Sequence, residues 1–302
     1  MCADVAFFGY GTLAVAGLDA LSTAGARVSA VVVPSNRSGD DVDIVRDAAT
    51  QRTARVLVQP ARREIAPFVE TLHTLAPDFI VVCSYTMILP QAVLAVPTRG
   101  AVNLHGGTLP EYRGGHVMQW AIINGERQFG VALHHLDEGV DTGPLIAEAR
   151  FPLDEHDDAC SVRQKIRQAG TGLLIQWWPR LVDGTAPRVA QDSSRARVWP
   201  MRTVEDGRLE WTMSAVTIAR TVRALRCNTP GAFVDVASRR LSIRQAQACP
   251  PQVAPVDPGR VVAVDRESVR VAAVDGDVQI RSAEIDGAPA TIETVARLLA
   301  AA

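Results

Sequence analysis

Three side chains with the chemistry for acyl transfer lie close together in the sequence: Asn103, His105 and Asp141. Asn103 and His105 are two residues apart at the end of an apolar run, so a β-strand would present both on one face. An amide can donate to an oxygen that gains negative charge, and an imidazole can accept or relay a proton near neutral pH. An ionised Asp141 beside the imidazole would orient it and stabilise its protonated form. These residue types therefore predict the transfer of an acyl group to an amine.

The surrounding residues narrow this chemistry and leave alternatives open. Residues 103–143 contain no serine or cysteine, so the transfer would be direct rather than through an acyl-enzyme. A histidine at a strand end more often has a structural role, which is the alternative for His105. His134 and His135 are adjacent on the following strand, so we expect them to face opposite sides and to be structural. The acidic sequence DEHDD at 154–158 is expected to cap a helix rather than to bind a metal.

The elements that would position these residues alternate through the first half of the chain. Short β-branched runs predict strands, with helical stretches between them, at 5–9, 28–33, 55–58, 79–83, 101–105 and 130–136. This alternation predicts an α/β domain with a Rossmann-like parallel sheet, whose ligands bind beyond the carboxyl ends of the strands. Asp141 would then face the same rim as His105. The GYG at 9–11 is expected to be a tight turn and not a dinucleotide motif, because Ala14 takes the third glycine position.

A chain of 302 residues can hold one large domain and a smaller one. A long amphipathic helix is expected after Phe151, and Pro179 is expected to kink or end it. Residues 183–205 are rich in Pro, Ser and Arg without periodicity, as linkers are. A short helix and four or five strand-like runs follow, which predict a small, OB-like β-barrel. We therefore expect an α/β catalytic domain at 1–182, a linker at 183–205 and a β-barrel domain at 206–302.

The composition excludes several classes of protein. A chain with 47% hydrophobic and 21% charged residues is not disordered, and it lacks the apolar run of about 18 residues that a membrane span needs. The start lacks the basic region of a signal peptide, so a cytoplasmic location without a membrane partner is expected. A net charge of -2 gives no global attraction for nucleic acid, and DNA is not expected as a partner. Five scattered cysteines without a CxxC motif are expected to be reduced thiols that bind no metal: Cys2, Cys83, Cys160, Cys227 and Cys249.

The motif N-x-H-G-x-x-L-P-x-Y-R-G that starts at Asn103, with L-D-E-G-V-D-T-G after it, resembles the formyltransferase family that uses 10-formyltetrahydrofolate. SYTMILPQAVL at 84–94 is similar to the folate-pocket loop of that family. EDGRLEW at 205–211 and PGAF at 230–233 are similar to the opening of its C-terminal barrel. The resemblance covers essentially the whole chain and implies a folate-dependent one-carbon transferase without a metal. It also implies that Asn103, His105 and Asp141 are the catalytic residues.

The same resemblance implies further site residues. Two loops are expected to bind 10-formyltetrahydrofolate, through Ser84, Tyr85, Thr86, Met87, Ile88, Leu89, Leu136, Glu138, Gly139 and Val140. Three residues around the central motif are expected to contact the formyl acceptor: Thr108, His116 and Gln119. Arg113 is expected to be structural, because the YRG turn of the family packs against the core.

The acceptor is the point on which branches of the family differ. The branch that acts on methionyl-tRNA usually has Ser-Leu-Leu-Pro where this chain has Gly107-Thr108-Leu109-Pro110, and it carries a basic loop after the second strand. Here residues 34–49 hold two arginines and four aspartates, which would repel phosphates. We therefore expect a small-molecule primary amine as acceptor: an amino sugar, or an amino acid, siderophore or antibiotic precursor. Initiator tRNA is the disfavoured alternative.

Two other functions are less favoured. Water could replace the amine, so that the enzyme would hydrolyse 10-formyltetrahydrofolate to formate. The chain could also bind folate without catalysis. The complete set of an amide, an imidazole and a carboxylate argues against the second possibility, because binding alone needs no oriented trio.

Overall fold

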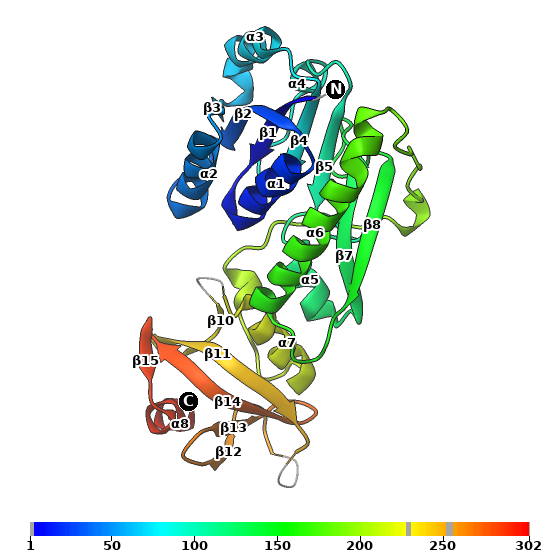
Figure 1. Ribbon diagram of the computed structural model, residues 1–302. Helices are drawn as coiled ribbons and strands as arrows, with labels where there is room; N and C mark the ends of the chain where they lie inside the picture. Colours follow the sequence, from blue (N-terminus) through cyan, green and yellow to red (C-terminus); the bar gives the residue numbers. More distant parts are fainter. Residues whose placement is uncertain (1–2, 228–230, 252–255, 302) are drawn as a thin grey trace. The chain divides into compact units, whose positions relative to one another are not determined.

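The computed structural model describes residues 3–227, 231–251 and 256–301, and Figure 1 shows its helices and strands. The chain forms two compact units. Unit 1 comprises Met1–Gly114, Gln128–Phe151 and Gln164–Trp199, and unit 2 comprises Gly115–Arg127, Pro152–Arg163 and Pro200–Ala302. The domains expected at 1–182 and 206–302 are continuous stretches of sequence. The two units instead each combine three separate segments that contact one another.

Unit 1 contains a seven-stranded sheet with the strand order β3-β2-β1-β4-β5-β7-β8. Its strands are β1 (Asp4–Gly9), β2 (Arg27–Pro34), β3 (Arg55–Gln59), β4 (Phe79–Cys83), β5 (Ala101–His105), β7 (Gln128–His135) and β8 (Leu145–Pro152). Its helices are α1 (Gly11–Thr23), α2 (Asp40–Gln51), η1 (Arg62–Glu64), α3 (Ile65–Leu75), α4 (Gln91–Leu94), most of α6 (Ala159–Val182) and η2 (Ser193–Arg195). The two-residue strands β6 (Arg113–Gly114) and β9 (Val198–Trp199) pair in parallel.

Alternate residues of β1 pack on opposite faces of this sheet, as the period of a strand requires. Phe8 packs edge-on against Phe68 of α3, with ring centroids 6.3 Å apart. Its neighbour Phe7 lies beside Gly17 of α1, where an added Cβ would be 3.4 Å from the ring. Both phenylalanines are fully buried, so the strand anchors hydrophobic core on each side. Figure 1 shows α1 and α6 in front of the strands.

The prediction of an entirely parallel sheet is wrong at β7, which runs antiparallel to β5. Strands β1 to β5 pair in parallel as expected. A parallel β7 would need a crossover helix that packs on the sheet and returns the chain to its starting end. The helix in this connection, α5 (Val117–Asn124), instead belongs to unit 2 and packs against α7 (Ala215–Leu225). The chain therefore re-enters the sheet from the end at which β5 finishes.

Two local predictions are decided by the backbone. The GYG at 9–11 is a tight turn as expected, because a Cβ at Gly9 would lie 2.6 Å from the Cβ of Ala14 and α1 begins at Gly11 with φ of 75°. Pro179 does not end the long helix, which continues to Val182. Pro179 lies near the C-terminal end of α6. A proline disturbs the geometry of a helix, but only a short part of α6 follows this one.

Unit 2 contains an antiparallel sheet with the path β10-β11-β14-β13-β12, and β15 pairs with β14. Its strands are β10 (Ala232–Val236), β11 (Arg239–Cys249), β12 (Val261–Val264), β13 (Val269–Ala272), β14 (Asp277–Ile285) and β15 (Ala288–Ala290), and its further helices are η3 (Glu205–Gly207) and α8 (Ile292–Ala300). Within the described residues, the short β15 brings the number of strands to six, against the four or five expected. No ladder joins β10 to β12 in the described parts of the chain. The expected order of an α/β domain followed by a small β-domain is confirmed, and the structure shows that the sheet of the second domain is antiparallel.

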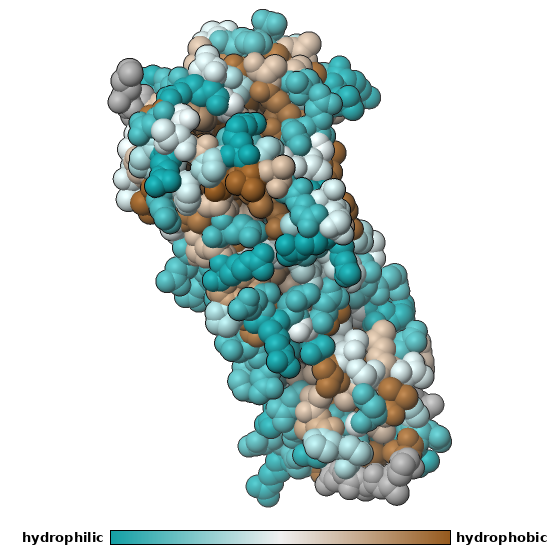
Figure 2. All heavy atoms as spheres, turned by 90° about the vertical axis from the view of Figure 1, so that its right-hand side faces the viewer, coloured by the Kyte–Doolittle hydropathy of each residue, from teal (hydrophilic) through white to brown (hydrophobic). Residues whose placement is uncertain are grey.

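Within the described residues, every helix is too short or too polar to cross a bilayer. Hydrophilic residues cover much of the face drawn in Figure 2, and hydrophobic residues lie between them in separate groups.

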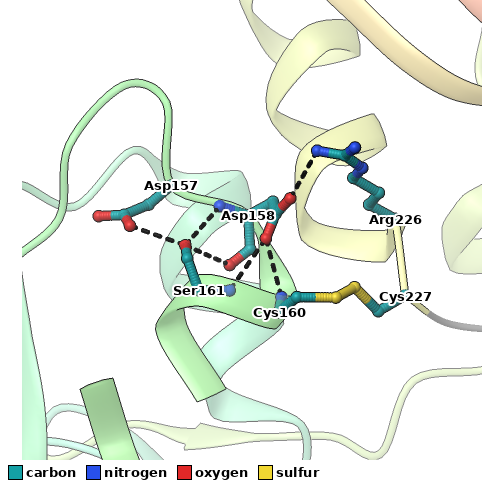
Figure 3. Close-up of a disulfide and its surroundings, with 6 residues drawn as sticks. All are labelled: Asp157, Asp158, Cys160, Ser161, Arg226 and Cys227. Carbon is teal, nitrogen blue, oxygen red and sulfur yellow. Dashed lines mark hydrogen bonds and ion pairs between the residues drawn. A yellow bond between two sulfur atoms is a disulfide. The ribbon is translucent and has the colours of Figure 1, made fainter. Parts of the chain in front are cut away.

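A disulfide joins two segments of unit 2 (Figure 3). It links Cys160 in the first turn of α6 to Cys227 just after α7, with their Cα atoms 6.1 Å apart. The same segments share an ion pair between Arg226 Nη1 and Asp158 Oδ2, at 2.8 Å. The expectation that these two cysteines are reduced thiols is wrong, because the fold places residues 67 positions apart in bonding range. Cys83 and Cys249 are free, and Cys2 lies outside the described residues.

The acidic sequence before α6 caps the helix as predicted. Asp158 Oδ1 accepts hydrogen bonds from the backbone N–H groups of Cys160 and Ser161, at 2.9 and 3.0 Å. The hydroxyl of Ser161 donates to Asp157 at 2.7 Å. Both carboxylates thus satisfy groups at the positive end of the helix (Figure 3).

We expect the serine variant Cys160→Ser to lower the free energy of unfolding by about 2–4 kcal/mol, because the disulfide restricts the unfolded chain. The measurement is the urea midpoint of the oxidised protein, compared with Cys249→Ser as the control for loss of a free thiol. A reductant should lower the midpoint of the wild type and leave that of Cys160→Ser unchanged. Equal midpoints with and without reductant in the wild type would contradict the prediction.

Candidate functional site

The structure brings Asn103, His105 and Asp141 into one buried polar cluster of unit 1. Asn103 Nδ2 lies 3.3 Å from Asp141 Oδ1, and His105 Nδ1 lies 3.5 Å from Asp141 Oδ2. The backbone N–H of Gly114 donates to the same Oδ2 at 2.9 Å. The side chains of His105 and Asp141 are only 8% and 12% exposed. Asn103 and His105 share one face of β5, as the strand period predicts.

Asp141 reaches the cluster because the loop after β7 folds back. The loop does not leave from the edge at which β5 ends, as it would from a parallel strand, because β7 is antiparallel and ends beside the start of β5. Gly143 permits the return, because a Cβ at this position would lie 1.8 Å from the carbonyl oxygen of His135. Asp137 Oδ1 braces the loop by accepting from Gly139 N at 3.1 Å and Thr142 Oγ1 at 2.5 Å. The sequence therefore predicts the right grouping, and the fold achieves it by a different route.

Three of the sequence-predicted site residues have a left-handed backbone. Ser84, His116 and Asp141 have φ of 55°, 50° and 53°. L-residues rarely adopt this conformation, which costs of order 1–3 kcal/mol and persists only where the surrounding structure holds it.

His134 is a member of the cluster that the sequence analysis treats as structural. Its ring is fully buried, with Nε2 3.1 Å from Asn103 Nδ2 and 3.6 Å from Asp141 Oδ1. Its Nδ1 lies 2.8 Å from the carbonyl oxygen of His135, which can only accept, so Nδ1 carries a proton. In the neutral ring Nε2 is then the acceptor for the Asn103 amide. The cross-strand pairing of Asn103 with His134 makes this contact, and no motif in the sequence indicates it.

His135 faces the other side of β7, as predicted. Its ring nitrogens lie 3.3 Å from the carbonyl oxygen of Pro187 and 3.0 Å from Arg188 Nη1. Burial and the positive charge of Arg188 lower its pKa from the ordinary value. His135 therefore has a neighbourhood of its own, separate from the cluster around Asp141.

The electrostatics of the cluster centre on Asp141. Burial by itself would raise the pKa of this carboxyl, but the charge available on His105, the nearby imidazole of His134 and the hydrogen bond from Gly114 N–H outweigh it. The pKa of Asp141 lies well below its ordinary range, so the group is a carboxylate at neutral pH. His105 presents both ring nitrogens to oxygen atoms, since its Nε2 lies 2.6 Å from the carbonyl oxygen of Tyr112. That arrangement suits an imidazole with a proton on each nitrogen.

The two adjacent histidines offer a matched pair of variants. His134→Ala should lower kcat by about tenfold or more, because Asn103 and Asp141 lose a shared partner that orients them. His135→Ala removes a similar ring from the opposite face and should leave kcat nearly unchanged. Steady-state kinetics of both variants, with thermal unfolding to verify the fold, measure the difference. Equal losses in the two variants would show that His134 has no special role.

The loop expected to bind the folate donor follows β4 and is anchored at several points. Tyr10 N donates to Ser84 O at 3.0 Å, which ties the ends of β1 and β4 together. The other members follow in order: Tyr85 packs edge-on against Phe8, Thr86 Oγ1 donates to Asn36, Met87 Sδ accepts from Ser35, Ile88 is 73% exposed, and Leu89 is buried in the core. Leu136 packs against the same core cluster as Tyr85 and Leu89. The two loops predicted to bind the donor are therefore anchored in the same hydrophobic core, the first through Tyr85 and Leu89 and the second through Leu136.

Two buried polar atoms beside this loop have no partner among the described residues. They are the hydroxyl of Tyr85 and Oε1 of Gln59, whose Nε2 donates to Ile88 O at 3.1 Å. A buried polar atom without a hydrogen bond costs free energy, and sites that bind a polar ligand often retain such atoms. Desolvation also raises the pKa of Tyr85, so its hydroxyl keeps its proton and can donate. Two polar atoms without a partner beside the exposed apolar side chain of Ile88 are groups that could hold a flat, polar ring.

The remaining predicted residues have the following places. Glu138, Gly139 and Val140 are exposed in the loop that carries Asp141. Among the residues expected to contact the acceptor, Thr108 is buried in unit 1, and Gln119 is buried in α5 of unit 2. His116 precedes α5 in unit 2, where its Nδ1 accepts from Arg202 N at 2.9 Å. Their contact with an acceptor stays a prediction.

Comparison with known proteins places two family domains on the chain. The family described as formyl transferase matches residues 3–177, and the formyl transferase C-terminal domain matches residues 202–298. A methionyl-tRNA formyltransferase of Myxococcus xanthus is 33% identical over 287 residues, which cover 94% of this chain and 90% of the relative. One from Anaeromyxobacter dehalogenans is 32% identical over 292 residues, which cover 95% and 93%.

A solved structure shares the fold. The N-formyltransferase of Helicobacter canadensis, in complex with folinic acid and dTDP-3-aminofucose, superposes with a TM-score of 0.69 at 16% identity, covering 93% of this chain and 99% of its own. The two domain matches define a transferase of one-carbon groups. The chain belongs to the formyl transferase family, a family of folate-dependent enzymes, and it is a formyltransferase.

Proposed function

We propose that this enzyme transfers the formyl group of 10-formyltetrahydrofolate to the amino group of methionyl-tRNA. The observation that carries the proposal is the sequence similarity to methionyl-tRNA formyltransferases. The identity is 32–33%, and the matched region covers nearly the whole of both chains, including both domains. We assign catalysis to the domain expected at 1–182, which carries the polar cluster. The small-molecule amine expected from the sequence becomes the second candidate.

The donor, when bound, supplies a formyl group on nitrogen that is suited to direct acyl transfer. Residues 84–89 and 136–140 would hold it. The hydroxyl of Tyr85 and Oε1 of Gln59 would supply buried hydrogen-bonding groups, since both lack a partner among the described residues. The exposed side chain of Ile88 would cover an apolar ring face.

The polar cluster would act on the transfer through charge and orientation. The positive charge of a protonated His105, together with the dipole of the Asn103 amide, would stabilise the oxygen that becomes negative when the amine nitrogen attacks. The carboxylate of Asp141 would hold both groups in place, since it lies 3.3 Å from Asn103 Nδ2 and 3.5 Å from His105 Nδ1. No side chain needs to form a covalent bond in this scheme.

Asp141 is a weak base, so we assign its role and that of the proton acceptor to different groups. A carboxylate whose pKa lies well below the ordinary range accepts a proton poorly at neutral pH. We therefore assign orientation and charge stabilisation to Asp141, and receipt of the amine proton to an imidazole of the cluster or to solvent.

A small-molecule amine remains as a second candidate because of one specific observation. Asp40, Asp41, Asp43 and Asp47 are all exposed on α2, and three of them occupy its first turn. Carboxylates are favourable at a helix N-terminus, so part of this charge serves the helix itself. The exposed acidic surface would nonetheless repel the phosphates of an RNA that approached it.

Assays of tetrahydrofolate release with different acceptors test the proposal. The enzyme should formylate initiator methionyl-tRNA, and the rate at limiting tRNA should fall about tenfold or more between 50 and 200 mM salt, because phosphate contacts release counterions. A dTDP-linked amino sugar should not be formylated. Formylation of the amino sugar alone, with little effect of salt, would replace the proposal by the second candidate. Formate production from the donor without any acceptor would indicate a hydrolase.

A further inference from the structure

The segment between the two matched family domains returns to the polar cluster through one side chain. Residues 178–201 lie outside both family matches, and Gln191 belongs to this segment. It is half-buried in unit 1, the unit that holds the cluster. Its sequence neighbours are mostly exposed, which makes an inward-directed glutamine unusual for the segment.

Every hydrogen-bonding position of the Gln191 amide is used. Nε2 donates to the backbone carbonyl oxygens of Asp141, at 2.9 Å, and Gly143, at 2.7 Å. Oε1 accepts from Arg113 Nε at 3.1 Å and from Arg113 Nη2 at 2.7 Å. A primary amide offers two N–H donors and two lone pairs, so this geometry satisfies all four.

These four bonds connect the backbone of the Asp141 loop to Arg113, and both of these neighbour the carboxylate of Asp141. On one side, Gln191 holds the backbone of Asp141, which has a left-handed φ of 53°. On the other side, it holds Arg113, which directly precedes the Gly114 N–H that donates to Asp141 Oδ2. Arg113 is 8% exposed, so its guanidinium needs the oxygen that Gln191 provides.

We propose that Gln191 is a positioning residue, which fixes the backbone of Asp141 so that its carboxylate faces Asn103 and His105. The inference rests on the proposed function, because it takes Asp141 to act in the reaction. It also extends the site beyond the matched family regions to the segment that connects them. Only the primary amides of glutamine and asparagine offer two donors for the loop carbonyls and two lone pairs for Arg113. The side chain of asparagine is shorter than that of glutamine.

Two variants of Gln191 separate positioning from packing. Gln191→Ala removes all four bonds, and Gln191→Glu keeps the size and the contact with Arg113 but cannot donate to the two carbonyl oxygens when ionised. Both should lower kcat for methionyl-tRNA by about 10-fold to 100-fold, because the carboxylate loses its fixed geometry. The KM for 10-formyltetrahydrofolate should stay within about twofold of the wild type. Gln176→Ala, at an exposed glutamine of α6, is the matched control and should keep full activity.

A double-mutant cycle with Asp141→Asn distinguishes a positioning role from a general structural one. If Gln191 acts through Asp141, adding Gln191→Ala to Asp141→Asn should cost little further activity. Additive losses, a loss confined to the KM for the donor, or full activity of Gln191→Ala would each overturn the inference. Full activity of Asp141→Asn would instead overturn the proposed role of Asp141. Should Gln191→Ala fail to fold, the isosteric Gln191→Glu supplies the same comparison.

A readout without any acceptor separates this inference from the choice of methionyl-tRNA. The imidazole NMR signals of His105 and His134, assigned through their alanine variants, report on the cluster in the free enzyme. Gln191→Ala should shift both sets of signals, and Gln176→Ala should shift neither. Unchanged signals in Gln191→Ala would overturn the inference, even if the wild type formylates a different amine.

Discussion

Replacing His105 with alanine is expected to lower the rate of formyl transfer by about a hundredfold or more while the fold remains intact. The imidazole is buried between the carboxylate of Asp141 and the carbonyl oxygen of Tyr112, so it is positioned before substrate arrives. Its loss removes the positive charge that would face the developing negative oxygen. The neighbouring carboxylate cannot replace it, because its own charge has the wrong sign.

The measurement is kcat for methionyl-tRNA, with the urea midpoint as the check on folding. His156→Ala provides the control, because that imidazole is 91% exposed in unit 2 and lies outside the cluster. We expect the control to retain wild-type turnover. Normal turnover in His105→Ala would remove His105 from the mechanism and favour a structural role for this histidine.

The variant Asp141→Asn is expected to have the largest effect, a loss in kcat of about 10³-fold or more. The substitution keeps the shape of the side chain but removes the charge that supports a protonated His105. It also presents an NH2 group where Asp141 now accepts from Asn103 or Gly114, so one hydrogen bond becomes a contact between two donors. Asp183→Asn, at an exposed position after α6, is the matched control. Retention of more than a tenth of the wild-type kcat would contradict the prediction.

The same variant has a defined effect on stability at low pH. The pKa of Asp141 is lower in the folded chain than its ordinary value of 3.8, so the ionised group stabilises the fold above that pH. This contribution is lost as the pH falls from about 5 toward the folded pKa, because the unfolded chain then takes up the proton first. Asp141→Asn should therefore lose less stability than the wild type across that acidic range. Urea midpoints measured from pH 6 downward would show it, and parallel curves would refute it.

The candidate site was predictable where its members share a motif or a strand period. Asn103 and His105 are two residues apart on β5, and Asp141 follows in the second motif, so spacing and resemblance indicate all three. His134 and Gln191 were not predictable in this way. His134 joins the cluster because β7 pairs antiparallel with β5 and places it opposite Asn103. Gln191 reaches Asp141 from 50 residues further along the chain, through a segment that has no periodicity.

By itself, the sequence determined the local features whose causes are local. Short β-branched apolar runs specify strands, glycines at 9–11 specify a tight turn, and the carboxylates at 154–158 specify the start of a helix. Only the tertiary structure decided the direction of β7, the return of the Asp141 loop and the bond between Cys160 and Cys227. Each of these depends on where distant segments meet, which no short window of sequence contains. The difference matters for the chemistry, because the carboxylate of Asp141 acquires its four partner residues from three separate segments of the chain.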